Sequence, residues 1–208
     1  MSRFGGYAGI SLVGSLIRVV LMIAILTAVY LAASLPFKIS LEIIPGFSDV
    51  RPVAALQPIY GIFFGIPGCI AFGLGNLLTD ILGDSLRASS LAGLVMNAVS
   101  PALFCLLWGR LRHGVFDLRA PKDIALFSLL SLLCAAVQSV AISGAVAFSY
   151  PEVDAFYFGL TVVGNHTLFP LLLGIPIAIL LQEELDVAPR GLGGPFLLVA
   201  VPHVPHGR

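Results

Sequence analysis

The sequence predicts an all-α integral membrane protein, a bundle of six transmembrane helices of which the second and third are short or broken. Hydrophobic residues make up 58% of the chain and charged residues only 11%, whereas about a quarter of the residues in soluble domains are charged. The mean hydropathy is +1.02. Apolar runs long enough to cross a hydrocarbon core of about 30 Å recur along the chain. We therefore expect a multi-pass protein in a lipid bilayer.

Charge and motif content argue against several other classes of protein. The formal net charge of +0 gives no reason to expect a nucleic-acid partner. Cys69, Cys105 and Cys134 are isolated within apolar runs, so we interpret them as packing residues and not as metal ligands or disulfide partners. The chain contains no H-E-x-x-H, G-x-S-x-G or P-loop motif. The sequence thus predicts neither an enzyme nor a metal or cofactor site on this chain.

The first predicted span runs from Val19 to Leu35, after an N-terminal segment, residues 1–18, that we expect in the cytoplasm. Its 17 residues make a helix of about 25 Å, just enough to cross a bilayer. A secretory signal peptide is the competing interpretation, because residues 32–34 (Ala-Ala-Ser) match a small-residue cleavage site. Arg18 lies too far into the chain for a signal peptide, which favours a span.

The next segment, Pro36 to Val50, mixes charged and apolar residues and is predicted as an amphipathic loop at the interface. Val53–Phe64 and Cys69–Leu82 follow, separated by a Gly-Ile-Pro-Gly turn signal. Each reaches only about 20 Å. They form either two short, tilted spans or one re-entrant hairpin, and both options return the chain to the side it left.

Three longer spans complete the predicted transmembrane domain of residues 19–182, at Leu91–Leu111, Ile124–Tyr150 and Phe156–Leu181. The tail, residues 183–208, leaves the membrane. With the N-terminus inside, eight of the 11 Lys and Arg residues fall on the cytoplasmic side, as the positive-inside rule requires. Both termini are therefore expected in the cytoplasm.

Intramembrane polar residues gather, on this topology, in the outer half or near the midplane. Ionisable groups there cost at least about 2.5 kcal/mol unless they find partners or water, so we interpret these residues as lining a small-molecule site. Asn76 and Asp80 share a helix face, and Asp80 is expected to pair with Arg51 or Arg87. The alternative is that these residues only hydrogen-bond helices together. The candidate site residues are Arg51, Asn76, Asp80, Asn97, Gln138, Asn165 and His166.

The stretch from Pro45 to Asp80 also resembles a known family. Its P-G-F-S-D-V-R-P entry, its F-F-G-I-P-G turn and its G-L-G-N-L-L-T-D exit are similar to the middle of S components, the substrate-capture subunits of energy-coupling factor (ECF) vitamin transporters, and above all to the group that includes queuosine-precursor transporters. Size and six-span layout agree over roughly residues 15 to 183.

The resemblance implies a function, a location and partners. It implies capture of a small vitamin- or nucleobase-like compound at the outer face of a bacterial or archaeal cytoplasmic membrane, followed by ATP-driven uptake. The partners would be a coupling membrane subunit and two ATPase subunits that carry the ATP. In the family, a small-x-x-x-small face of the first helix docks onto the coupling subunit, and Ala24, Ala28 and Ala32 match that pattern. Such stripes also occur in ordinary helix packing.

The sequence leaves the substrate open, because no substrate-specific signature can be matched. The residue pool suits a neutral or zwitterionic heterocycle better than a large anion. Two other classes remain as alternatives: a non-transporting assembly or scaffold protein, in which the polar residues join helices, and a stand-alone secondary transporter, which needs polar residues continuing into the inner half.

Overall fold

The computed structural model describes residues 12–45, 47–113, 116–185 and 187–192. Within these ranges five helices are long and apolar enough to cross a membrane, which confirms an all-α membrane protein. They are α1 (Leu12–Ser40), α2 (Leu56–Leu82), α3 (Ser89–Arg112), α4 (Pro121–Ser149), and a continuous fifth made of α5 (Ala155–Phe169), the π-helical turn η2 (Pro170–Gly174) and α6 (Ile175–Glu183). The six separate helices predicted from the sequence are thus not seen as such.

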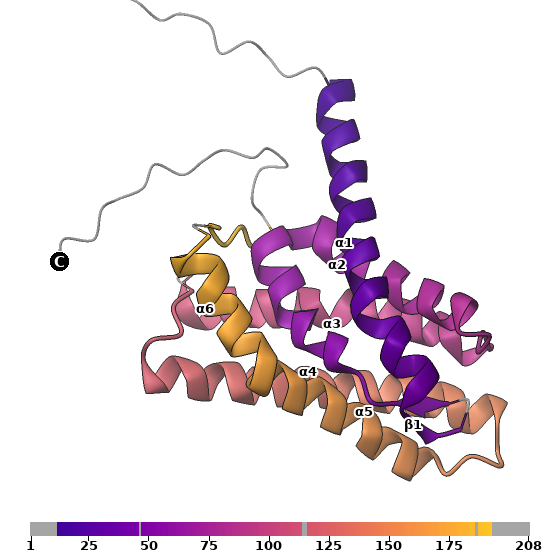
Figure 1. Cartoon of the computed structure of the whole chain (residues 1–208). Coiled ribbons are helices and arrows are strands. Elements are labelled where there is room, and N and C mark those ends of the chain that lie inside the picture. The colour runs from indigo at the N-terminus through magenta and orange to yellow at the C-terminus, as the bar shows by residue number, and fades with distance from the viewer. Residues whose placement is uncertain (1–11, 46, 114–115, 186, 193–208) are drawn as a thin grey trace, which may run out of the picture.

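The difference lies in α2, which joins the two short predicted segments through a sharp bend. Gly65 sits at the bend with φ 60° and ψ −142°, a conformation open to glycine and strained for other residues. Tyr60 and Phe72 would lie about 18 Å apart along a straight helix, yet their ring centroids are 5.5 Å apart. The second arm of α2 therefore folds back beside the first, as Figure 1 shows.

The bend breaks the helical hydrogen-bond pattern, and the chain after α6 repairs it. The backbone N–H groups of Arg190 and Gly191 both donate to the carbonyl of Ile62, at 2.8 and 3.0 Å. A buried carbonyl without a donor would be costly in an apolar setting. Residues 190–191 therefore brace the bend. The rest of the tail, residues 193–208, lies outside the described residues.

Helix α1 stands at the edge of the bundle, and its N-terminal half projects from it (Figure 1). Only 17% of its most apolar window is buried, against 67% for the bent α2, so α2 is the central element. Helix α1 is also longer than the predicted Val19–Leu35 span at both ends. It continues past Pro36, because a proline removes only one helical hydrogen bond and is tolerated in membrane helices.

The segment predicted as an interfacial loop forms a small antiparallel hairpin. Strands β1 (Glu42–Ile44) and β2 (Ser48–Asp49) pair with Glu42 opposite Asp49. A 3-10 turn, η1 (Pro52–Ala55), then leads into α2. The hairpin places Phe47 against Tyr150 at the end of α4. Ser48 and Arg51 contact α5 at Thr161 and Asn165.

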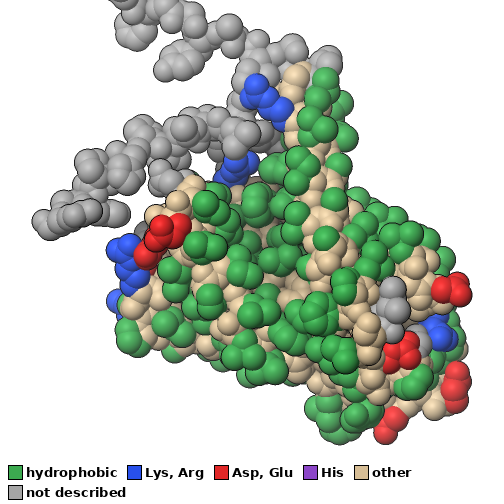
Figure 2. All heavy atoms as spheres, viewed as in Figure 1, with side chains coloured by type: hydrophobic (Ala, Val, Ile, Leu, Met, Phe, Trp, Pro, Cys, Tyr) green, Lys and Arg blue, Asp and Glu red, His purple; other side chains and the backbone are tan. Residues whose placement is uncertain are grey.

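Large apolar side chains cover the outside of the bundle. Phe148, Phe156 and Val140 are 91%, 78% and 76% exposed. In Figure 2 the visible face is mostly apolar, and the acidic and basic side chains lie at its margins. This is the surface expected of a protein whose middle is surrounded by lipid.

Candidate functional site

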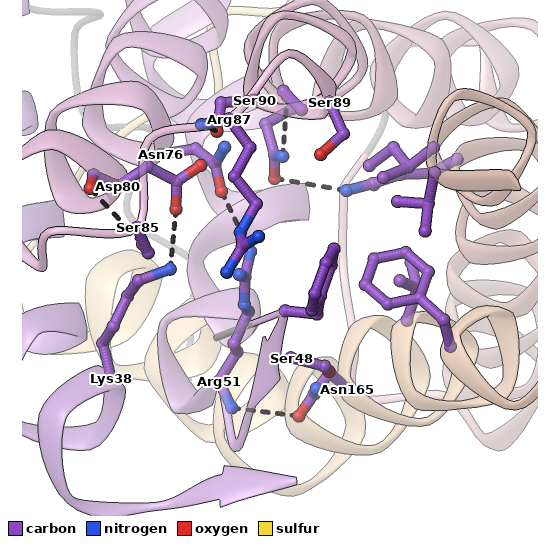
Figure 3. Close-up of a pocket in the computed structure, with 18 of the residues that line it drawn as sticks. Lys38, Ser48, Arg51, Asn76, Asp80, Ser85, Arg87, Ser89, Ser90 and Asn165 are labelled. Carbon is purple, nitrogen blue, oxygen red and sulfur yellow. Dashed lines mark hydrogen bonds and ion pairs between the residues drawn. The ribbon is translucent and has the colours of Figure 1, made fainter. Parts of the chain in front are cut away.

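A polar cavity lies where the second arm of α2 meets α3, α4, α5 and the β1–β2 hairpin. In this state its own side chains nearly fill it, leaving about 50 Å³ for the centre of a water molecule, so a larger ligand enters only as those side chains move apart. Figure 3 shows Arg51 and Arg87 reaching toward each other across the cavity, with Lys38 and Asp80 to one side. The lining residues come from distant parts of the chain, from Lys38 to His166.

All seven candidate residues predicted from the sequence line this one cavity. Arg51 is half-buried and the other six are buried. Their role as ligand-binding residues stays a prediction, but their convergence is a property of the fold. Sequence reasoning missed several further lining residues, which come from the end of α1, the hairpin, the loop after α2 and the start of α3. They are Lys38, Phe47, Ser48, Ser85, Arg87, Ser89 and Ser90.

Two ion pairs stand at the charged side of the cavity, and one of them corrects an expectation. Asp80 pairs with Lys38, Nζ to Oδ1 2.7 Å, and not with Arg51 or Arg87 as its position in the sequence suggested. Lys38 reaches it because α1 extends four residues beyond Pro36. The second pair joins Arg51 Nε to Asp49 Oδ1 at 2.7 Å. Burial alone would lower the pKa of Arg51, but the Asp49 carboxylate and the smaller contributions of Tyr30 and Asp80 together outweigh it and raise that pKa above its ordinary value.

Arg51 is also held by two asparagines. Its Nη1 donates to Asn76 Oδ1 at 3.0 Å, which ties the start of α2 to its returning arm. Its backbone N–H donates to Asn165 Oδ1 at 3.0 Å, and Asn165 Nδ2 donates to the carbonyl of Asp49 at 2.9 Å. Asn165 therefore pairs with the backbone like a neighbouring strand and fixes the hairpin to α5.

The floor of the cavity is a chain of hydrogen bonds whose direction follows from one backbone carbonyl. The carbonyl of Gly93 can only accept, so Asn97 presents Nδ2 to it, at 2.8 Å, and turns Oδ1 to Gln138. Gln138 Nε2 then donates to Asn97 Oδ1 at 3.2 Å. The same Nε2 lies 3.3 Å from His166 Nε2, to which it gives its second hydrogen.

The chain continues from the imidazole into the bundle. Because His166 Nε2 accepts, its proton is on Nδ1 and is donated to Gln57 Oε1. Gln57 Nε2 in turn donates to Ser100 Oγ. His166 is thereby held as the neutral Nδ1–H tautomer, and Gln57, which the sequence reasoning did not place in the site, orients it.

One atom of this network has no partner. Both hydrogens of Gln138 Nε2 are used, and Gln138 Oε1 is buried without a hydrogen-bond donor among the described residues. Gln138 itself is fully buried. An unpaired buried acceptor costs about 1–3 kcal/mol. Gln138 Oε1 is therefore free to accept a hydrogen bond from a bound molecule.

The opposite wall of the cavity is apolar and aromatic. Ile142 and Val146 of α4 pack with Phe158 and Val162 of α5 in one buried cluster. Phe47 of the hairpin joins this cluster. The guanidinium of Arg87 lies 4.0 Å from the centroid of the Phe47 ring, within the range of a cation–π contact.

The alanine stripe predicted on the first helix faces away from the bundle. Ala24, Ala28 and Ala32 are exposed, while Leu26 and Tyr30 point inward and are buried. The stripe therefore does not serve packing within the described part of this chain.

A second cavity lies at the other end of the bundle, between the bend of α2 and the end of α3. It leaves about 320 Å³ for the centre of a water molecule. Its lining is largely apolar, with Arg110 and Arg190 as charged members, and contains none of the seven candidate residues. No cluster of three or more His, Cys, Asp or Glu side chains that could hold a metal ion occurs in the described ranges.

A comparison of the chain with protein-family models, with curated proteins and with solved structures found no match in any of the three.

Proposed function

We propose that this protein is a membrane-embedded capture subunit of an ECF-type importer, which binds a small vitamin- or nucleobase-like compound for uptake driven by partner subunits. The observation that carries the proposal is the convergence of Arg51, Asn76, Asp80, Asn97, Gln138, Asn165 and His166 on one cavity at one end of an apolar bundle. Polar groups are costly at such depth, and a substrate is a reason for them to be there.

The resemblance of the middle of the chain to S components supports the same proposal. Counting the two arms of α2 as two short crossings gives the six-segment layout of that family. The first arm then starts on the cavity side and the second arm returns to it, since Arg51 and Asn76 are in contact. Because most Lys and Arg residues fall on the opposite side, the positive-inside rule turns the cavity outward and leaves both termini in the cytoplasm.

The exposed stripe of Ala24, Ala28 and Ala32 is the proposed docking face for the coupling membrane subunit. Small residues four apart let a second helix approach closely, and the peripheral position of α1 leaves this face open. The two ATPase subunits, which carry the ATP, would attach through that coupling subunit.

Two other functions compete with this one. A scaffold is favoured by the hydrogen bonding of the cavity residues to one another, which also joins helices. A stand-alone transporter needs a polar path through the other half of the bundle, where the second cavity is largely apolar. Alanine at Asn97 or Gln138 separates capture from scaffolding, because a scaffold loses stability without any change in ligand uptake.

The test is affinity purification of the tagged full chain from its own membranes in a mild detergent. We expect the coupling subunit and the ATPases to co-purify, to be lost with Ala28→Phe and to be kept with Val140→Phe. Val140 is a matched control because it is exposed on α4, away from the stripe. Purification without these subunits, or equal behaviour of the two variants, would contradict the proposal.

A further inference from the structure

The geometry points to a substrate class: a small planar heterocycle, neutral or anionic, that donates a ring N–H to Gln138 Oε1 and presents a carbonyl or carboxylate oxygen to Asn76 and the neighbouring guanidinium groups. This inference rests on the proposed function, because it describes what the same cavity binds. Four observations carry it.

The first is the acceptor in the floor. The direction of every hydrogen bond from Gly93 to Ser100 is fixed, which leaves Gln138 Oε1 as an acceptor without a donor. Rotating the Gln138 amide by 180° would not supply a donor. It would exchange Nε2 for Oε1 and place that oxygen against Asn97 Oδ1, where two acceptors would face each other. A ligand N–H supplies the missing donor.

The second is a donor on the other side of the cavity. Arg51 occupies Asn76 Oδ1, so the amide nitrogen of Asn76 is turned toward Gly93. A Cβ atom added at Gly93 would lie 2.8 Å from that nitrogen, and the glycine therefore keeps room for it. Asn76 Nδ2 can donate to a ligand oxygen, and Arg51 and Arg87 lie at the same end of the cavity (Figure 3).

The third is charge. The lining contains three cationic side chains, Lys38, Arg51 and Arg87, and one carboxylate, Asp80, which leaves an excess of two positive charges. Including Asp49, which pairs with Arg51, the excess is +1. Each carboxylate is already engaged through its Oδ1 by a cation at 2.7 Å. Asp49 Oδ2 has no partner among the described residues, but Asp49 does not line the cavity. A cationic ligand would find no carboxylate to itself, so the cavity selects against it.

The fourth is shape. The planar guanidinium of Arg87 lies 4.0 Å from the centroid of Phe47, which shows that a flat group fits on that ring. Phe158 and three aliphatic side chains of α4 and α5 form the rest of this wall. A flat ring can take the same kind of place, with its polar edge toward Asn76 and Gln138.

The test measures thermal unfolding of the full chain in nanodiscs with matched probes at about 1 mM. The N–H members are uracil, xanthine and orotate, their partners 1,3-dimethyluracil, caffeine and 1,3-dimethylorotate, and 1-methylnicotinamide is the cation. We expect at least one N–H member to raise the unfolding temperature by about 2 °C or more, with its methylated partner and the cation without effect.

Two variants check the assignment to Gln138. Gln138→Met should weaken binding of the active probe by about tenfold or more, since a buried hydrogen bond is lost. Ser131→Ala should leave binding unchanged. Ser131 lies two turns away on the same helix, and its buried hydroxyl also lacks a partner among the residues that the structure describes, but it does not line the cavity. If Gln138→Met does not fold, the comparison of each N–H probe with its methylated partner still tests whether the ligand must donate a hydrogen bond.

The inference is overturned if no N–H probe stabilises the protein, if methylation makes no difference, if the cation binds best, or if Gln138→Met binds as well as the parent chain. Failure of the inference differs from failure of capture. A small molecule that co-purifies with the protein but is cationic or lacks an N–H would refute the substrate class alone. A protein that binds no small molecule at all would refute both.

Discussion

Gln138 of α4 and His166 of α5 are joined by a hydrogen bond from Gln138 Nε2 to His166 Nε2, 3.3 Å long. Together with the bond to Asn97 it links three helices at the floor of the cavity. The imidazole passes the connection on to Gln57 of the central helix. Stability and the polarity of the site therefore depend on the same side chains.

The first prediction concerns His166. Alanine at this position leaves Gln57 Oε1 and one hydrogen of Gln138 without partners, so we expect a loss of about 2 kcal/mol or more, seen as a lower unfolding temperature in nanodiscs. Thr167→Ala is the control, because the Thr167 hydroxyl is buried but has no hydrogen-bond partner in the described part of the chain. Equal effects of the two substitutions would show that the network does not stabilise the fold.

The second prediction concerns the attachment of the hairpin. Asn165→Ala removes the acceptor for the Arg51 backbone N–H and the donor to the Asp49 carbonyl. We expect faster hydrogen exchange at the Arg51 amide. Thr161→Val removes the contact with the Ser48 hydroxyl, 2.6 Å away, and the bond to the carbonyl of Phe158. Neither involves the Arg51 amide, which should stay protected. An unchanged exchange rate in Asn165→Ala would refute the clamp.

The third prediction uses a double-mutant cycle on Lys38 and Asp80. Their side chains are 11% exposed each, so removing one partner leaves a poorly hydrated charge. We expect each single variant, Lys38→Met and Asp80→Asn, to cost about 3 kcal/mol, and the double variant to recover most of that loss. Arg119 and Glu183 provide the comparison, because they are 66% and 38% exposed. Their coupling should be much weaker, and additive effects in the Lys38–Asp80 cycle would contradict the prediction.

The fourth prediction concerns the bend of α2. Gly65 has a positive φ, and an added Cβ would lie 2.6 Å from the carbonyl oxygen of Gly191. Gly65→Ala should therefore destabilise the protein by about 1–3 kcal/mol. Gly144→Ala is the control, since, apart from the backbone of its own helix, none of the described residues lies within 4 Å of its added Cβ. A neutral Gly65→Ala variant would mean that the bend tolerates another conformation.

The sequence predicts much of this architecture because long apolar runs and turn residues are local signals. The three later spans agree with α3, α4 and the helix from Ala155 to Glu183 within a few residues. The turn signal at Gly65 also marks the bend, although it could not distinguish two short spans from one re-entrant hairpin. The polar residues were found because each is costly in an apolar segment. The predicted topology also places all of them in the same half of the bundle or near its middle.

The partners of these residues were beyond the sequence. Membrane helices that are apolar all round carry little information about which face points inward. The sequence therefore could not identify Lys38 as the ion-pair partner of Asp80. It depended on how far α1 continues beyond Pro36. Phe47 and Arg87 lie in connecting segments whose paths are set by tertiary contacts. The one available signal was that Lys38 and Arg87 share a predicted side with Arg51.

The most direct test of the central claim, that the cavity captures a small molecule, is native mass spectrometry of the protein gently extracted from its own membranes. We predict a co-purifying small heterocycle that is retained in Ser131→Ala and lost in Gln138→Met. A protein that carries no small molecule, or one whose bound species is unaffected by Gln138→Met, would contradict the account and leave the polar residues as contacts between helices.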